Sequence, residues 1–332
     1  MRNRHFVTIA LILFLLTSSN FTFANFKSDT LFLKPFSHKF SARILFGIKE
    51  FSISISSSSK RSNSSPKVIY KPNNGVVGGI GLTYKNILIG YYFNISGTEL
   101  NNREFGKTHI ADYQVSLTNR FFYISGFHRT YNGFYVSKPY ESYPGWKEGM
   151  PYPQRKDIIY NTKGIETIIN LNPSRYSLNA SLKFTEHQIQ SVLAPLVNFN
   201  YSNSMVKADS SLIPLHLSGY FFNEKELYQT NFSGWTLMPG LSYSFVRNRW
   251  FFNPMLFTGF GYLKKELLFK DQNSEKYKAS YFRINSRLNY GYNGKNFFTG
   301  IFFEWNEMFL PKRNLMIKTE NLNLMLMLGL RF

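Results

Sequence analysis

The sequence predicts an all-β fold: a transmembrane, antiparallel, up-and-down β-barrel of about 14 strands, with 12 strands as the alternative. The first observation is the end of the chain, where residues 321–332 carry leucine at every second position and finish on Phe332. In a strand, such leucines all point to one face and suit lipid. The second observation is similar alternation in many other segments. The third is that no apolar run reaches the roughly 20 residues that a membrane-spanning helix needs.

The N-terminus has the features of a secretory signal peptide. Residues 1–5 are basic, residues 6–16 form an apolar run, and residues 22–24 supply small side chains for cleavage. We therefore expect a signal peptide over 1–24, a periplasmic N-terminal segment over 25–40 and a barrel in the bacterial outer membrane over 41–332. The chain contains no cysteine, which argues against a lipid anchor and excludes disulfides and thiolate chemistry.

The composition agrees with a barrel. The chain has 34 Phe and 22 Tyr, and yet its mean hydropathy is slightly negative. A barrel explains both facts, because each strand turns apolar side chains outward and polar side chains inward. The formal charge is +20. For a secreted chain this charge favours contact with membrane lipid and lipopolysaccharide, and we expect no nucleic-acid partner.

Alternating apolar and polar residues, bounded by turn residues, predict strands. Thirteen segments qualify: 41–55, 76–84, 86–95, 110–118, 121–131, 158–171, 176–184, 191–204, 235–245, 250–263, 282–290, 297–306 and 321–332. Bacterial barrels have an even number of strands, with short periplasmic turns and long outer loops. Short and long connections stay in phase only if one more strand lies between residues 204 and 232, and 212–222 is the candidate. The count becomes 12 if residues 76–95 form a periplasmic or re-entrant element.

Two details of the strands and loops carry further predictions. In segment 41–55 the apolar phase shifts, which predicts a β-bulge near Lys49 and Glu50. Residues 56–65 are a polar, serine-rich tract and indicate a mobile outer loop. The loop 138–153 is rich in aromatic residues and prolines. It is too long for a plain connection, so it forms a lid, a plug or a ligand platform, or else it lies at the lipid headgroups.

The chain offers little support for an enzyme, and we expect no catalytic residues, cofactor or metal. His216 and Ser218 are two residues apart, a spacing that lets a base and a nucleophile share one face of a strand, as in outer-membrane phospholipases. The Asn-Gly continuation of those lipases is missing after Ser218. His109 with Asp112, and Glu186 with His187, bring together fewer than the three or four ligands of a stable metal site.

The predicted lumen carries a candidate charge cluster, consisting of Lys183, Arg283, Arg287, Glu304 and Arg331. Two interpretations remain open. Charges can be paired across strands to lock the wall, with Glu304 bound to one of the three arginines. Alternatively, a ring of cations makes a pore selective for small anionic solutes. The terminal Phe332 is the predicted signal for the barrel-assembly machinery.

Four segments resemble a known family. They are 70–74 (YKPNN), 79–85 (GIGLTYK), 131–135 (YNGFY) and 209–214 (DSSLIP). In this order they are similar to pieces of a family of outer-membrane proteins from Bacteroidota catalogued as domain of unknown function 4421. The resemblance implies a barrel-like outer-membrane protein and brings no activity or functional residues with it. Three classes of function are therefore carried forward: a channel for small anionic solutes, a closed-lumen structural or surface-interaction barrel, and, third, a lipid-modifying enzyme.

Overall fold

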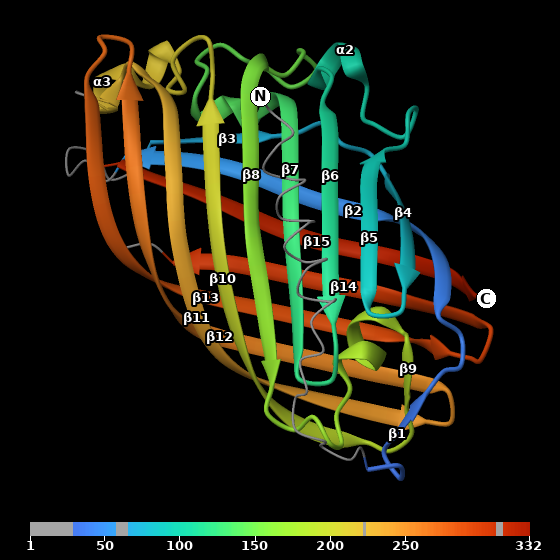
Figure 1. Cartoon of the computed structure of the whole chain (residues 1–332). Coiled ribbons are helices and arrows are strands. Elements are labelled where there is room, and N and C mark those ends of the chain that lie inside the picture. Colours follow the sequence, from blue (N-terminus) through green and yellow to red (C-terminus); the bar gives the residue numbers. More distant parts are fainter. Residues whose placement is uncertain (1–28, 58–65, 222–223, 310–314) are drawn as a thin grey trace.

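Twelve strands close an antiparallel barrel (Figure 1). The computed structural model describes residues 29–57, 66–221, 224–309 and 315–332. Around the wall the described strands follow the order β2, β4, β5, β6, β7, β8, β10, β11, β12, β13, β14 and β15, and β15 pairs with β2 to close the ring. Their bounds are β2 Phe40–Ser57, β4 Val77–Tyr84, β5 Ile87–Asn94, β6 His109–Thr118, β7 Phe122–Ser137, β8 Gln154–Asn170, β10 Val192–Lys207, β11 Leu227–Arg247, β12 Trp250–Phe269, β13 Ser274–Asn293, β14 Phe297–Phe309 and β15 Leu315–Arg331.

The described residues form three further strands that are not part of this ring. The strand β3 (Lys67–Lys71) bridges β2 and β7 beyond the short strands β4 to β6. Strands β1 (Leu33–Pro35) and β9 (Glu186–Gln188) pair with each other at the opposite end of the barrel (Figure 1). The helical turns are α2 (Asn102–Phe105), η1 (Pro139–Glu141), η2 (Asn179–Lys183), η3 (Leu215–Leu217) and α3 (Ser218–Phe221). Among the described residues, no helix is long and apolar enough to cross a membrane.

The wall obeys the predicted period of two. On β15, Leu324, Leu326, Leu328 and Leu330 are exposed on the outer face, whereas Met325, Met327 and Arg331 are buried in the lumen. The register of β15 against β2 is continuous from Leu315 to Arg331. The predicted C-terminal strand is therefore confirmed, and it is the strand that closes the barrel. The predicted signal peptide, 1–24, lies outside the described residues.

The count of 14 strands is wrong, and the alternative of 12 is correct. Residues 176–184 contain the π-helical turn η2 inside the lumen, and residues 212–221 contain η3 and α3 at one end. Each misassigned segment added one false crossing of the membrane. Two false crossings together kept the short and long connections in phase, so the comparison of connection lengths did not reveal either error. The reason given for 12 strands was also wrong, since residues 76–95 supply the wall strands β4 and β5.

A helical spacing explains both misassigned segments. Tyr176, Ala180 and Phe184 are four residues apart and buried, and so are Ile213, Leu217 and Phe221. Such short apolar runs fit a helical turn as well as a strand. Their apolar side chains therefore fill the barrel and do not face outward.

The predicted bulge in β2 is absent. The pairing with β15 runs without a shift past Lys49 and Glu50. Ile44, Phe46 and Ile48 point outward, whereas Phe51, Ile53 and Ile55 point inward. The backbone of β2 stays regular. The apolar residues move from even to odd positions because the inner surface of the barrel becomes apolar toward the loop end.

Apolar clusters fill both ends of the lumen. We call the end of the barrel that carries the C-terminus and the short turns the turn end. The opposite end is the loop end. At the loop end, inward side chains of eight wall strands pack with Leu212, Ile213, Leu217 and Phe221, and we call this cluster the loop-end cap. At the turn end, residues 176–188 and β1 form the turn-end cap, in which Tyr176 and Leu178 pack against one side of the wall and Phe184 against the other.

Candidate functional site in the lumen

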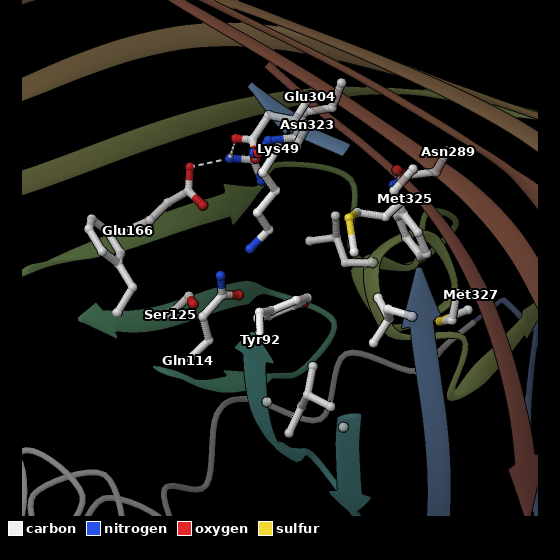
Figure 2. A pocket seen from close by; sticks show the side chains of 18 of the residues that line it. Lys49, Tyr92, Gln114, Ser125, Glu166, Asn289, Glu304, Asn323, Met325 and Met327 are labelled. Atoms are coloured by element: carbon white, nitrogen blue, oxygen red, sulfur yellow. Dashed lines mark hydrogen bonds and ion pairs between the residues drawn. The ribbon is translucent and has the colours of Figure 1, made fainter. Parts of the chain in front are cut away.

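Between the two caps lies a polar cavity of about 250 Å³. Its wall combines inward residues of the strands with Leu182 of the turn-end cap. Figure 2 shows Lys49 extending into this space toward Tyr92 and Gln114, with Glu166 and Glu304 at its rim. The charged residues at this level form what we call the mid-lumen cluster, defined as Lys49, Asp112, Arg129, Glu166, Arg283, Arg287 and Glu304.

Asp112 on β6 is the centre of one half of the cluster. Its carboxylate is fully buried and lies 2.6 Å from the Lys49 ammonium and 3.1 Å from Nε of Arg129. The Lys49 ammonium also lies 3.6 Å from the centre of the Tyr92 ring. Two cations from β2 and β7 therefore share one carboxylate, an arrangement that ties three strands together across the lumen.

Arg287 on β13 is the centre of the other half. Its guanidinium forms ion pairs with Glu166 of β8 and, at 3.1 Å, with Glu304 of β14. Asparagine side chains also donate to the two carboxylates: Asn198 donates to Glu166 at 2.8 Å, and Asn306 donates to Glu304 at 2.9 Å. The pair of Arg287 and Glu166 spans the lumen, because β8 and β13 are separated by three other strands.

Arg283 differs from the other cations of the cluster. Its guanidinium donates to the side-chain oxygens of Asn200 and Asn306, each at 3.1 Å. Within the described part of the chain, no ion pair joins Arg283 to a carboxylate. The cluster holds four cations and three carboxylates, so its formal excess charge is positive, and Arg283 accounts for it.

The sequence matches the family model described as Domain of unknown function (DUF4421) over residues 27–332. The chain belongs to this family. No curated protein matches the sequence. Solved structures similar to the chain are outer-membrane barrels. They include the outer membrane protease OmpT from Escherichia coli, at 12% identity and a TM-score of 0.41, covering 92% of this chain and 99% of that one.

Two further outer-membrane structures show a similar degree of likeness. OmpT, an outer membrane protein of Vibrio cholerae, has 7% identity and a TM-score of 0.34, with 88% of this chain and 98% of that chain covered. The monoaromatic hydrocarbon channel TodX has 6% identity and a TM-score of 0.31, with 89% and 91% covered.

The DUF4421 barrel brings together only part of the charge cluster expected from its sequence. Arg283, Arg287 and Glu304 lie side by side at mid-lumen, and Arg287 is the arginine that binds Glu304. Lys183 is not on the wall: it belongs to the turn-end cap, where its ammonium donates to the carbonyl oxygens of Asn86 and Ser116, both at 2.8 Å. Lys183 therefore joins the cap to the turn between β4 and β5 and to strand β6.

Arg331 also belongs to the turn end. Its guanidinium donates to the carbonyl oxygens of Gly294 and Phe184 and stacks 4.1 Å from the centre of the Phe36 ring. It thus fastens the last strand to the cap and reaches no residue of the mid-lumen cluster. Phe332 is exposed, its amide donates to the carbonyl of Phe40 at 2.9 Å, and the two rings lie 5.9 Å apart.

Sequence reasoning missed Lys49, Asp112, Arg129 and Glu166. The outward set of β6, which includes Tyr113, Val115 and Leu117, fixed Asp112 as an inward residue. That signal was present, but it did not identify a partner. The partners lie on β2 and β7. Which residues face each other depends on the register between strands, and the sequence pattern of one strand carries no information on that register.

The loop end of the DUF4421 barrel is a packed structure. Three of the four family segments meet there: the Tyr70 hydroxyl donates to the Leu212 carbonyl at 2.7 Å, and Lys71 pairs with Tyr135 where β3 meets β7. In the 138–153 loop, Tyr143 packs against the loop-end cap, and burial there raises the pKa of its phenol. This loop is therefore part of the closure at that end.

The two residues considered for catalysis do not lie on a strand. His216 is in η3, with its ring 6.0 Å from that of Tyr143, and Ser218 begins α3. The argument that they share the face of one strand therefore fails. In the described ranges, no three histidine or acidic side chains group as metal ligands.

Proposed function

We propose that this protein is an outer-membrane barrel with a lumen closed at both ends, which acts as a structural or surface-interaction protein. The observation that carries this proposal is the pair of apolar caps. Val206 and Leu212 at the loop end, and Tyr176 and Phe184 at the turn end, are fully buried inside the ring of strands. Water and ions need a continuous polar path, and packed apolar side chains interrupt it at two levels.

The outer surface supports the membrane location. On β11, Trp235 and Phe245 mark the two edges of an apolar stretch that contains Leu237 and Leu241, all exposed. Ten residues of strand extend about 34 Å, which at a tilt of about 45° spans about 24 Å. That height matches the apolar band of about 25 Å, bordered by aromatic residues, that outer-membrane barrels present to lipid. An origin in Bacteroidota remains a prediction from the family resemblance.

The mid-lumen cluster has a structural role in this proposal. Buried ion pairs from six strands fix how the wall strands face one another.

The deciding experiment is single-channel conductance of the refolded mature chain in a planar bilayer, with reversal potentials in asymmetric KCl. We expect silence from a barrel whose folding is verified by its mobility shift on heating in dodecyl sulfate. Steady conductance steps would overturn the proposal.

A channel for small anionic solutes is the second candidate, and Arg283 is the observation that favours it. This cation faces the cavity, and within the described ranges its hydrogen-bond partners are the side-chain oxygens of Asn200 and Asn306, each at 3.1 Å. The channel requires both caps to move. The double variant Arg283→Ala and Arg287→Ala distinguishes the candidates, because a conducting barrel would lose anion preference whereas a closed barrel would lose only stability.

A further inference from the structure

Arg43 on β2 is a buried cation to which the protein supplies no carboxylate. Its guanidinium donates to the Thr83 hydroxyl at 3.1 Å, to the Lys183 carbonyl oxygen at 2.8 Å and to the Met327 sulfur at 3.6 Å. Its Nε is buried and has no hydrogen-bond partner within the described ranges. All 19 acidic residues lie in those ranges, and none of them forms an ion pair with Arg43. The charge of Arg43 is therefore balanced by no acidic side chain of this protein.

The position of Arg43 distinguishes it from other cations in the lumen. Lys183 and Arg331 also donate to carbonyl oxygens at the turn end, but neither lines the cavity between the caps. Arg283 lines that cavity, and two side-chain oxygens accept from its guanidinium. Arg43 lines the cavity and retains a donor without an acceptor in the described part of the chain. Because an uncompensated buried charge is unfavourable, the cavity beside Arg43 suits an anion.

The wall beside Arg43 is recessed. Inward positions of five strands, each paired with the next, form a row across it: Arg43, Gly81, Gly90, Gln114 and Phe127. A β carbon on Gly81 would lie 2.8 Å from Cγ of Arg43, so glycine lets the arginine lie along the wall. A β carbon on Gly90 would have no heavy atom closer than 3.7 Å, so the cavity extends to the backbone there. We call the space between Arg43 and Gln114 the glycine recess.

Apolar side chains flank the glycine recess above and below this row. Leu45 is the next inward residue of β2, and Leu88 is the inward residue of β5 that precedes the row. Tyr92 is the inward residue of β5 that follows it, and Figure 2 shows Tyr92 and Gln114 projecting into the cavity. The recess therefore offers a cation at one end, an amide at the other, and apolar surface beside both.

We propose that the glycine recess binds a small carboxylate with an apolar body. The carboxylate accepts from Nε of Arg43 and balances its charge. The body lies over Gly81 and Gly90, next to Leu45 and Leu88. The cavity has about 250 Å³, whereas an apolar cavity of about 150 Å³ holds benzene, so a ligand of about ten non-hydrogen atoms fits. This inference rests on the proposed closed lumen, because the caps then enclose the ligand as the barrel folds and retain it.

The test refolds the full mature chain from urea into detergent micelles in the presence of ω-trifluorohexanoate, a carboxylate whose fluorine atoms are read by NMR. Free probe is then removed by desalting. We expect the folded barrel to retain the probe in stoichiometric amount. The charge control is ω-trifluorohexylamine, which has the same apolar body and a cationic head, and which the barrel should not retain.

Two variants test the site itself. Gly90→Val fills the recess and leaves Arg43 in place, and the backbone at Gly90 is outside the left-handed region, so valine is tolerated there. Arg43→Gln removes the charge. Each should retain at least tenfold less probe than the unmodified barrel. The matched control is Gly219→Val, at an exposed position of the loop end where a β carbon also meets no close neighbour, and it should retain the probe fully.

Three results would overturn the inference. They are no retention by an unmodified barrel of verified folding, equal retention by Gly90→Val and Gly219→Val, and equal retention of the amine and the carboxylate. If Arg43→Gln does not fold, Gly90→Val and the amine still decide. Conductance tests the closed lumen separately. A silent barrel without retained probe refutes only this inference, whereas a conducting barrel refutes the closed lumen, and binding is then read with the probe in excess.

Discussion

Asp112 is the residue whose charge the closed-lumen structure needs most. Its carboxylate is fully buried and is the shared partner of Lys49 and Arg129. Asp112→Asn keeps the shape of the side chain and removes its charge. Leaving one buried charge unpaired costs about 3 to 5 kcal/mol. Asp112→Asn leaves two cations without their carboxylate, and we expect the free energy of unfolding to fall by about the cost of one. The Lys49 ammonium keeps its contact with the Tyr92 ring, and such contacts contribute about 2 kcal/mol when desolvated.

The assay is urea unfolding of the refolded barrel in phosphatidylcholine vesicles, followed by tryptophan fluorescence. The control is Glu141→Gln, because Glu141 forms a largely exposed pair with Lys138 at 4.0 Å and such pairs contribute at most about 1 kcal/mol. Adding Lys49→Met to Asp112→Asn should restore part of the loss by removing one stranded cation. If Asp112→Asn is no less stable than the Glu141→Gln control, the cluster does not stabilise the wall and the reasoning is wrong.

Three further predictions follow from the wall and the turn-end cap. Leu326→Arg places a charge on the outer apolar face and should lower the folded fraction in vesicles, because such a charge costs about 2 to 4 kcal/mol at mid-bilayer; normal insertion would contradict the assigned face. Deletion of Phe332 should reduce outer-membrane assembly in cells, measured by surface protease accessibility, while refolding in detergent is retained. Phe184→Ala should cost about 3 to 5 kcal/mol of stability by leaving a cavity in the cap, read by urea unfolding; an unchanged midpoint would remove Phe184 from the cap.

The outward face of the barrel could be predicted from sequence, and the reason is physical. A lipid-facing surface requires apolar side chains at every second position, whatever lies inside. The alternation in β13 therefore placed Phe282 and Leu288 outward and Arg283 and Arg287 inward, as the structure has them. The last strand was predicted from the same pattern together with its place at the end of the chain, and it closes the barrel against β2.

The inside of the barrel could not be predicted in the same way. Tyr176 and Phe184 sit in a segment that alternates like a strand, and yet it folds into the lumen because its apolar side chains also fit a helical turn. The partners of Asp112 are 63 residues away in one case and on a different strand in each. Such pairings depend on the combined register of several strands, and the sequence of a single strand does not encode that register.

The caps and the mid-lumen cluster should stabilise each other, which gives the structure a test beyond single variants. Packed apolar residues at both ends keep water from the cavity, and ion pairs are stronger where the effective dielectric is lower. Opening the turn-end cap with Phe184→Ala would hydrate the cavity, because Leu182 of the same cap lines it. Asp112→Asn should then cost less in the Phe184→Ala background than in the unmodified barrel. Coupled sites show such differences at about 0.5 to 3 kcal/mol. Strict additivity in urea unfolding would mean that water already reaches the cluster, and the lumen would then be open at the turn end.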